Sequence, residues 1–224
     1  FIGGGQMGEA LIRGIIQSGL HAAGDILVSE PDHGRRVYLK ETYQVQVFDS
    51  GVPIWQACST VILAVKPQHM GALLSGAQEL ITTAHLIISI AAGLPISFYE
   101  DHLPGKACKI IRVMPNTPAL VLQGASALSG NNNVRAEELA QAKALFEAVG
   151  VAVILEAQYL DAVTGLSGSG PAYVFTFIAG MSDAGHKTRL TRALAETMPL
   201  HPVLGSVTLM QESQKHTAAP RTIF

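Results

Sequence analysis

The sequence predicts an α/β fold with a mainly parallel sheet, followed by a shorter helical segment. Short apolar runs rich in β-branched residues alternate with helix-length segments over residues 1–155, which is typical of βαβ units. These runs are continuously apolar, as expected for strands that are buried on both faces. After about residue 158 such runs stop. We therefore expect two domains, residues 1–157 and residues 158–224.

The composition predicts a folded protein without a nucleic-acid partner. Of the 224 residues, 48% are hydrophobic and 14% are charged, which favours a packed core over disorder. The formal net charge is −2, and no run of Lys or Arg offers a surface for phosphate backbones. No stretch reaches the length and apolarity of a membrane helix. We expect a cytoplasmic protein with two buried thiols, Cys58 and Cys108, and no metal site.

The first predicted element is a strand that ends in a glycine-rich turn. Residues 1–8 read Phe-Ile-Gly-Gly-Gly-Gln-Met-Gly, a G-x-G-x-x-G pattern at Gly3, Gly5 and Gly8, and a helix with regularly spaced apolar residues follows. Such a turn lets the backbone approach a pyrophosphate closely and points a helix N-terminus at the anion. The context predicts a Rossmann domain that binds a dinucleotide.

Seven further strands and one clear helix are predicted in the first domain. Between the last two strands, apolar residues over 139–149 recur at helical spacing. Asn133 is the expected N-cap of this helix, and Gly150 lies just past its end. The predicted strands cover residues 26–28, 45–48, 61–65, 86–90, 110–113, 125–128 and 151–155.

The second domain is predicted to be helical and to need a partner. Residues 171–181 are apolar nearly all the way round, so the helix that they form must be covered on most sides. The rest of the chain is too short to cover it. We therefore expect a second subunit to do so.

The residues after the second strand bear on the choice of dinucleotide. Ser29 and Glu30 stand where an acidic residue would bind the adenosine ribose. Glu30 favours NADH, whereas Ser29 together with Arg35 and Arg36 would suit the additional phosphate of NADPH. The sequence leaves this choice open.

Three further segments carry distinctive motifs. They are residues 64–67 (Ala-Val-Lys-Pro), residues 113–118 (Val-Met-Pro-Asn-Thr-Pro) and residues 161–173, which include Ser-Gly-Ser-Gly-Pro-Ala-Tyr. Together with the glycine turn, they resemble pyrroline-5-carboxylate reductases in order and spacing, and the longest motif is the most specific. The resemblance implies an α/β Rossmann domain followed by an all-α dimerisation domain, an arrangement like that of 6-phosphogluconate dehydrogenase.

The resemblance also implies an activity and a set of site residues. The reaction would transfer a hydride from NADH or NADPH to 1-pyrroline-5-carboxylate and give L-proline, the last step of proline biosynthesis, in a homodimer or higher homo-oligomer. Because the cofactor supplies the hydride, the protein mainly supplies position and electrostatics. Asn116, between two prolines that stiffen its loop, is the predicted catalytic residue. The predicted cofactor-binding residues are Gly3, Gly5, Gln6, Met7, Gly8, Ser29, Ala64, Val65, Lys66, Pro67, Ala91 and Asn116.

The C-terminal segment departs from the family pattern. The Ser-Pro-Gly-Gly-Thr-Thr loop that would hold the substrate carboxylate is absent, and Arg189 stands where a glycine is expected. Pro199 and Pro202 interrupt an expected long helix, where an interior proline costs about 3 kcal/mol. We therefore expect an incomplete helical domain. Two alternatives stay open: a reductase of the hydroxyacid-dehydrogenase type with Lys187 as its catalytic lysine, and a dinucleotide-binding protein without turnover.

Overall fold

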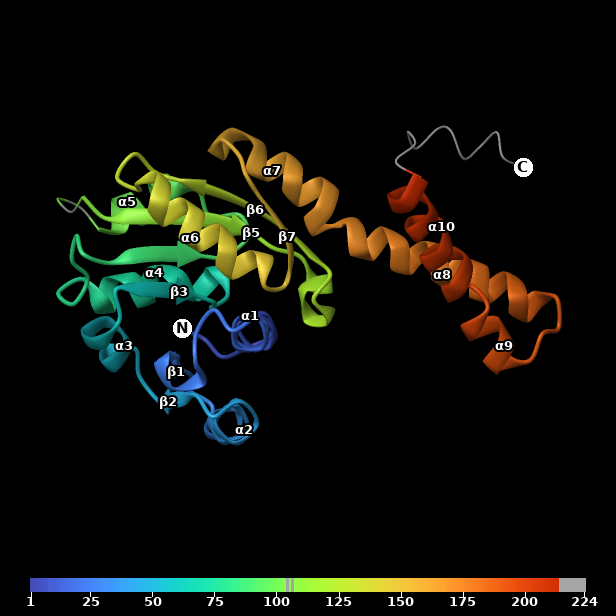
Figure 1. The fold of residues 1–224 in the computed structure, drawn as a ribbon, viewed down its shortest axis with the longest axis horizontal. Helices are drawn as coiled ribbons and strands as arrows, with labels where there is room; N and C mark the ends of the chain where they lie inside the picture. The colour runs from blue at the N-terminus through green and yellow to red at the C-terminus, as the bar shows by residue number, and fades with distance from the viewer. Residues whose placement is uncertain (104, 106, 214–224) are drawn as a thin grey trace. The chain divides into compact units, whose positions relative to one another are not determined.

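A computed structural model describes residues 1–103, 105 and 107–213. The chain divides into two compact units, Phe1–Ser169 and a second unit that begins at Gly170. The first unit is an α/β domain, and the described part of the second unit is helical (Figure 1). The predicted order of an α/β domain followed by a helical domain is confirmed.

The sheet of the first unit is built around the start of the chain. Ile2 forms parallel bridges to Ser29 and to Leu63, and so joins a pair of strands, β1 and β2, to a five-stranded part in the order β3-β4-β5-β6-β7. All strand pairs are parallel except β5 with β6. The strands are β1 (Leu27–Ser29), β2 (Gln46–Phe48), β3 (Thr60–Leu63), β4 (Leu86–Ser89), β5 (Lys109–Met114), β6 (Gly124–Gly130) and β7 (Gly150–Ile154). All seven strands predicted after the glycine turn are therefore present.

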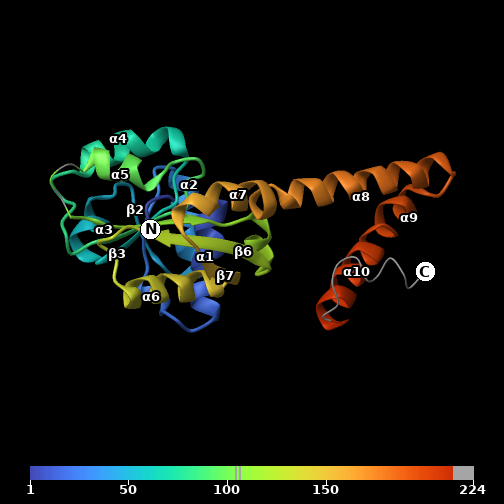
Figure 2. The same cartoon turned by 90° about the horizontal axis from the view of Figure 1, so that it is seen from above.

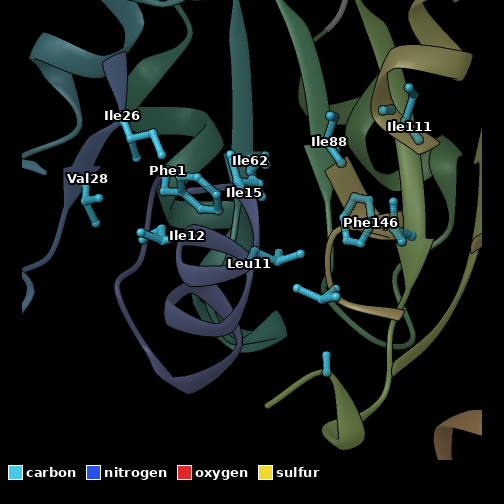
Figure 3. Close-up of a cluster of buried hydrophobic side chains, with 14 of the residues drawn as sticks. Phe1, Leu11, Ile12, Ile15, Ile26, Val28, Ile62, Ile88, Ile111 and Phe146 are labelled. Atoms are coloured by element: carbon cyan, nitrogen blue, oxygen red, sulfur yellow. The ribbon is translucent and has the colours of Figure 1, made fainter. Parts of the chain in front are cut away.

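Helices cover both faces of this sheet, which explains the continuous apolar runs. Ile62 and Ile88 pack against α1 and α6 on one face (Figure 3), whereas their neighbours Val61 and Ile87 pack against α3, α4 and α5 on the other. Figure 2 shows α4 and α5 on one side of the sheet and α6 on the opposite side. The helices of this unit are α1 (Gln6–Gln17), α2 (His33–Tyr43), α3 (Val52–Ala57), α4 (Pro67–Ala77), α5 (Ile96–His102), α6 (Ala136–Glu147) and α7 (Leu160–Val163).

Helix α6 confirms the predicted helix but begins later than expected. Its N-cap is Arg135, and the prediction of Asn133 as N-cap is wrong. The side-chain amide of Asn133 instead donates to the carbonyl oxygen of Cys108 at 3.0 Å. The carboxylate of Glu138 accepts a hydrogen bond from the backbone N–H of Arg135 at 3.0 Å, which is the contact that a glutamate at the third helical position makes.

The second unit contains α8 (Gly170–Lys187), α9 (Arg192–Thr197) and α10 (Leu200–Ser213). Pro199 lies between α9 and α10, and Pro202 lies in the first turn of α10, where its missing N–H costs little. Arg189, just after α8, has a φ of +65°. This left-handed conformation is the one that glycine adopts most easily after a helix, and it is the position at which the sequence led us to expect glycine.

We predict that Arg189→Gly raises the free energy of unfolding by about 0.5–1 kcal/mol, because glycine lacks the Cβ that disfavours a positive φ. Lys187→Gly is the control, since Lys187 is helical and glycine there should lower stability by about 0.5–1 kcal/mol. Denaturant unfolding of both variants and the wild type gives the comparison. A loss of stability in Arg189→Gly would contradict the assignment of strain to this residue.

Candidate functional site

The glycine turn is held in place by contacts that leave no room for a side chain at two positions. Gly3 has a φ of +102°, and a Cβ on it would lie 2.6 Å from the carbonyl oxygen of Ala64. A Cβ on Gly8 would lie 2.7 Å from the carbonyl oxygen of Gly3. Both glycines are therefore needed for packing. Their close contacts place the start of α1 at the carboxyl ends of β1 and β3.

Gly5 has a different role, because its surroundings are open. A Cβ on Gly5 would meet nothing within 4 Å, and its φ of −66° is accessible to any residue. Gly5 is the N-cap of α1, and no side chain caps this helix. The amides of the first turn are thus available to an anion, which the positive end of the helix dipole also favours. The turn fits a pyrophosphate.

A cavity of about 650 Å³ opens beside this turn, at the carboxyl ends of the first three strands. Open α/β sheets bind their ligands at this edge, and the volume is in the range of small-molecule sites. Six of the predicted cofactor-binding residues line it: Gly3, Gly5, Ser29, Ala64, Val65 and Lys66. A second cavity, of about 590 Å³, includes Leu27, Thr60 and Leu86 in its lining and so lies at the opposite, amino ends of the strands.

The remaining predicted cofactor-binding residues do not line the cavity. Gln6 and Met7 form the first turn of α1, and Pro67 is the first residue of α4. Ala91 is 3% exposed and packs in the apolar cluster beside β4. The cofactor contacts of these four residues stay predictions, as do those of Gly8 and Asn116, which do not line the cavity either.

The segment after β2 also lines the cavity, although none of its residues was among the predicted site residues. Asp49 and Ser50 follow β2, as Glu30 follows β1, and they line the same cavity as Glu30 and Ser29, the last residue of β1. Trp55, in α3, lines it as well. A signal was available, because the Asp-Ser-Gly sequence at residues 49–51 marks a strand exit and parallel strands end at the same edge.

Asn116, the predicted catalytic residue, follows β5 and uses both polar atoms of its side chain. Its Oδ1 accepts a hydrogen bond from the backbone N–H of Ala125 at 2.8 Å, and its Nδ2 donates to the carbonyl oxygen of Ser167 at 3.0 Å. Ser167 belongs to a π-helical turn, Thr164–Gly168, and such turns are frequent at functional sites. Asn116 therefore ties the loop after β5 to the long sequence motif.

An ion pair between a buried arginine and an exposed aspartate joins the same motif to the sheet. The guanidinium of Arg112, a residue that is 5% exposed, donates to Asp161 Oδ1 at 2.9 Å. Arg112 lies beside Ser89 of β4, whose hydroxyl shares a hydrogen bond of 2.5 Å with Tyr99. Burial raises the pKa of Tyr99, so this phenol stays protonated at neutral pH. The contact between Arg112 and Asp161 links the start of the motif to β5.

Two family models match this chain, one in its N-terminal part and one in its C-terminal part. Residues 1–93 match the family described as NADP oxidoreductase coenzyme F420-dependent, and residues 157–222 match the family described as pyrroline-5-carboxylate reductase dimerisation. The fold, the glycine turn and these matches define a Rossmann-type oxidoreductase that uses a nicotinamide dinucleotide and carries a helical dimerisation domain.

The relatives narrow this class to one family. The chain is 41% identical to the pyrroline-5-carboxylate reductase of Synechocystis sp., over 97% of this chain and 80% of the relative. It therefore belongs to the pyrroline-5-carboxylate reductase family, which confirms the resemblance. The structure of the Coxiella burnetii pyrroline-5-carboxylate reductase matches with a TM-score of 0.91 at 30% identity, over 100% of this chain and 83% of that one. The Plasmodium falciparum pyrroline carboxylate reductase with NADP bound matches with a TM-score of 0.84 at 31% identity, over 96% of this chain and 79% of that one.

We predict that Gly5→Val lowers the affinity for dinucleotide at least about a hundredfold, because the new side chain would occupy the space beside the first turn of α1. Stability should change by no more than about 1 kcal/mol, since the backbone there suits any residue. Calorimetric titration with NADH and denaturant unfolding measure the two effects.

Two other glycines serve as comparisons for Gly5→Val. Gly24 is exposed with open surroundings, so Gly24→Val should leave NADH affinity unchanged. Gly3→Ala should destabilise the fold, because its Cβ would overlap the Ala64 carbonyl. Wild-type affinity in Gly5→Val would show that the pyrophosphate lies elsewhere.

Proposed function

We propose that this protein reduces 1-pyrroline-5-carboxylate to L-proline with NADH or NADPH, the last step of proline biosynthesis. The observation that carries this proposal is membership of the family, at 41% identity over 80% of the length of a relative. The glycine turn, the uncapped start of α1 and the adjoining cavity support it, because together they suit the pyrophosphate and adenosine of a dinucleotide.

The bound dinucleotide would supply a hydride to the imine carbon of the substrate, and the residues of this chain bind and orient the reactants. The first turn of α1 holds the pyrophosphate, and residues 64–66 line the path along the ends of the strands. The loop after β5 borders the reacting centre. A protonated imine is already a good hydride acceptor. The reaction therefore depends more on the positioning of the two reactants than on acid–base catalysis.

Asn116 fits a positioning role better than a catalytic one. Its two hydrogen bonds, to the backbone of Ala125 and Ser167, are internal to the protein and hold two segments of the α/β unit together. The side chain thereby fixes the loop that borders the nicotinamide end of the site. This role is part of the proposal.

The family match also bears on assembly and on the domain boundary. The chain carries the dimerisation domain of its family and forms a homo-oligomer. We propose that the domain boundary lies near residue 157, where the dimerisation match begins, before the compact helical unit starts at Gly170.

No described helix has the length and apolarity needed to cross a membrane. A cytoplasmic location and the absence of a nucleic-acid partner stay predictions.

The proposed reaction is tested by the oxidation of NADH and NADPH, followed by absorbance, with 1-pyrroline-5-carboxylate as substrate. Turnover that yields L-proline supports the proposal. Cofactor binding without turnover would instead favour the alternative function, that of a dinucleotide-binding protein without catalytic activity. Turnover only with members of a hydroxyacid panel would favour a reductase of the hydroxyacid-dehydrogenase type, for which Lys187, exposed at the end of α8, was the candidate.

We predict that Asn116→Ala lowers kcat about tenfold, because the loop loses both of its fixing hydrogen bonds. The Kd for NADH should change by less than about twofold. Thr117→Ala, at the exposed neighbouring position, is the control and should keep wild-type kcat. Full activity of Asn116→Ala would reduce Asn116 to an ordinary turn residue.

We predict that Phe175→Glu disrupts the homo-oligomer. Tyr173, Phe175 and Phe177 of α8 are 62%, 66% and 61% exposed in a single chain, and a charge in an apolar interface is costly. Light scattering after size-exclusion chromatography should show monomers or aggregates. Val37→Glu changes an exposed apolar residue of α2 in the same way and should leave the oligomer intact. A stable oligomer of Phe175→Glu would place the interface elsewhere.

A further inference from the structure

The end of the cavity beside β1 and β2 carries negative charge. Glu30 and Asp49, which follow these two strands, both line the cavity. Among the described residues that line the cavity, Lys66 is a cation, and it follows β3 instead of β1 or β2. Neither Arg35 nor Arg36 belongs to this lining. The strand ends at which a Rossmann domain receives the adenosine ribose therefore present two carboxylates and two serines.

The carboxylate of Glu30 is fixed in place by the glycine turn. Its Oε2 accepts a hydrogen bond from the backbone N–H of Gly4 at 2.9 Å, and its Oε1 accepts one from the backbone N–H of Asp32 at 3.1 Å. An ionised carboxylate has about four acceptor positions, so about two stay available. Ribose hydroxyls can donate to these positions. A phosphate group, which is itself an anion and an acceptor, cannot.

The two arginines after β1 make contacts within the protein instead of lining the cavity. Arg36 donates through Nη1 to the carbonyl oxygens of Glu30 and Pro31, both at 2.7 Å. Arg35 donates through Nε to the carbonyl oxygen of Gly4 at 2.6 Å, and it forms an ion pair with Glu9. Both guanidinium groups thus stabilise the turn between the glycine loop and α2.

Glu9 keeps Arg35 in this position. Partial burial acts to raise the pKa of Glu9, but hydrogen bonds from Tyr43, Arg35 and Tyr38 outweigh it, and the pKa is lowered. Glu9 is therefore ionised at neutral pH. The guanidinium of Arg35 also lies 5.0 Å from the centre of the Tyr38 ring, within the range of a cation–π contact.

From these contacts we infer that Glu30 makes this protein selective for NADH over NADPH, by accepting hydrogen bonds from the adenosine ribose and by repelling the 2′-phosphate. This inference rests on the proposed function, and it decides between the two cofactors that the sequence left open. A family member binds NADP, so the selectivity would come from the residues at this strand exit rather than from the family fold. Repulsion between two like charges a few ångströms apart at a partly exposed site lowers the binding affinity about tenfold or more.

The test compares the binding of NADH and NADPH to the full chain. Trp55 is the single tryptophan of the chain and lines the same cavity, so its fluorescence reports binding without turnover. The variants are Glu30→Gln, which removes the charge and keeps an acceptor for the Gly4 amide, and Glu41→Gln, a control with the same change at an exposed position of α2. The kcat/KM with each cofactor is measured in parallel.

We expect the wild type and Glu41→Gln to bind NADH about tenfold or more tightly than NADPH, and Glu30→Gln to narrow this ratio to about twofold. A wild type that binds NADPH equally well or better would overturn the inference, even if Glu30→Gln does not fold. An unchanged ratio in folded Glu30→Gln would also overturn it. Selective NADH binding without turnover of 1-pyrroline-5-carboxylate would leave the role of Glu30 standing and overturn the proposed function instead.

Discussion

The geometry of the site depends on the close contact between Gly3 and the carbonyl group of Ala64. Only a residue without a Cβ fits there, because the added atom would come within 2.6 Å of the carbonyl oxygen. Ile2 is bridged to β1 and β3, so this contact fixes the turn between the two strands whose ends line the cavity. One packing constraint therefore sets the relative positions of the start of α1, the ends of β1 and β3, and the carboxylate of Glu30.

The segments that follow β5 and β7 are joined by polar side-chain contacts instead of close packing. Asn116 holds the loop after β5 to the π-helical turn, and Arg112 holds Asp161 at the start of the same motif. Such hydrogen bonds are directional, and leaving a buried partner unpaired is costly. These hydrogen bonds can therefore position the loop after β5, which would border the nicotinamide end of the cofactor. Close packing of glycines alone would not fix that loop.

The sequence was sufficient for the features that depend on local residue patterns. The strands are apolar on both faces because helices cover both. The expectation of a glycine at Arg189 came from the family resemblance, and the backbone there has a positive φ. Features that depend on distant partners were not foreseen. Asn133 bonds to Cys108 on a neighbouring segment and so does not cap α6, and Asp49 reaches the cavity only because β2 pairs with β1.

We propose that the glycine turn and the start of α1 hold the pyrophosphate of the cofactor, and the rest of the site is built on this contact. A crystal structure of this protein with NADH tests it most directly. We expect pyrophosphate oxygens about 3 Å from the backbone amides of the first turn of α1, with the adenosine ribose at Glu30. A dinucleotide bound in the cavity at the opposite ends of the strands, beside Leu27, Thr60 and Leu86, would contradict it.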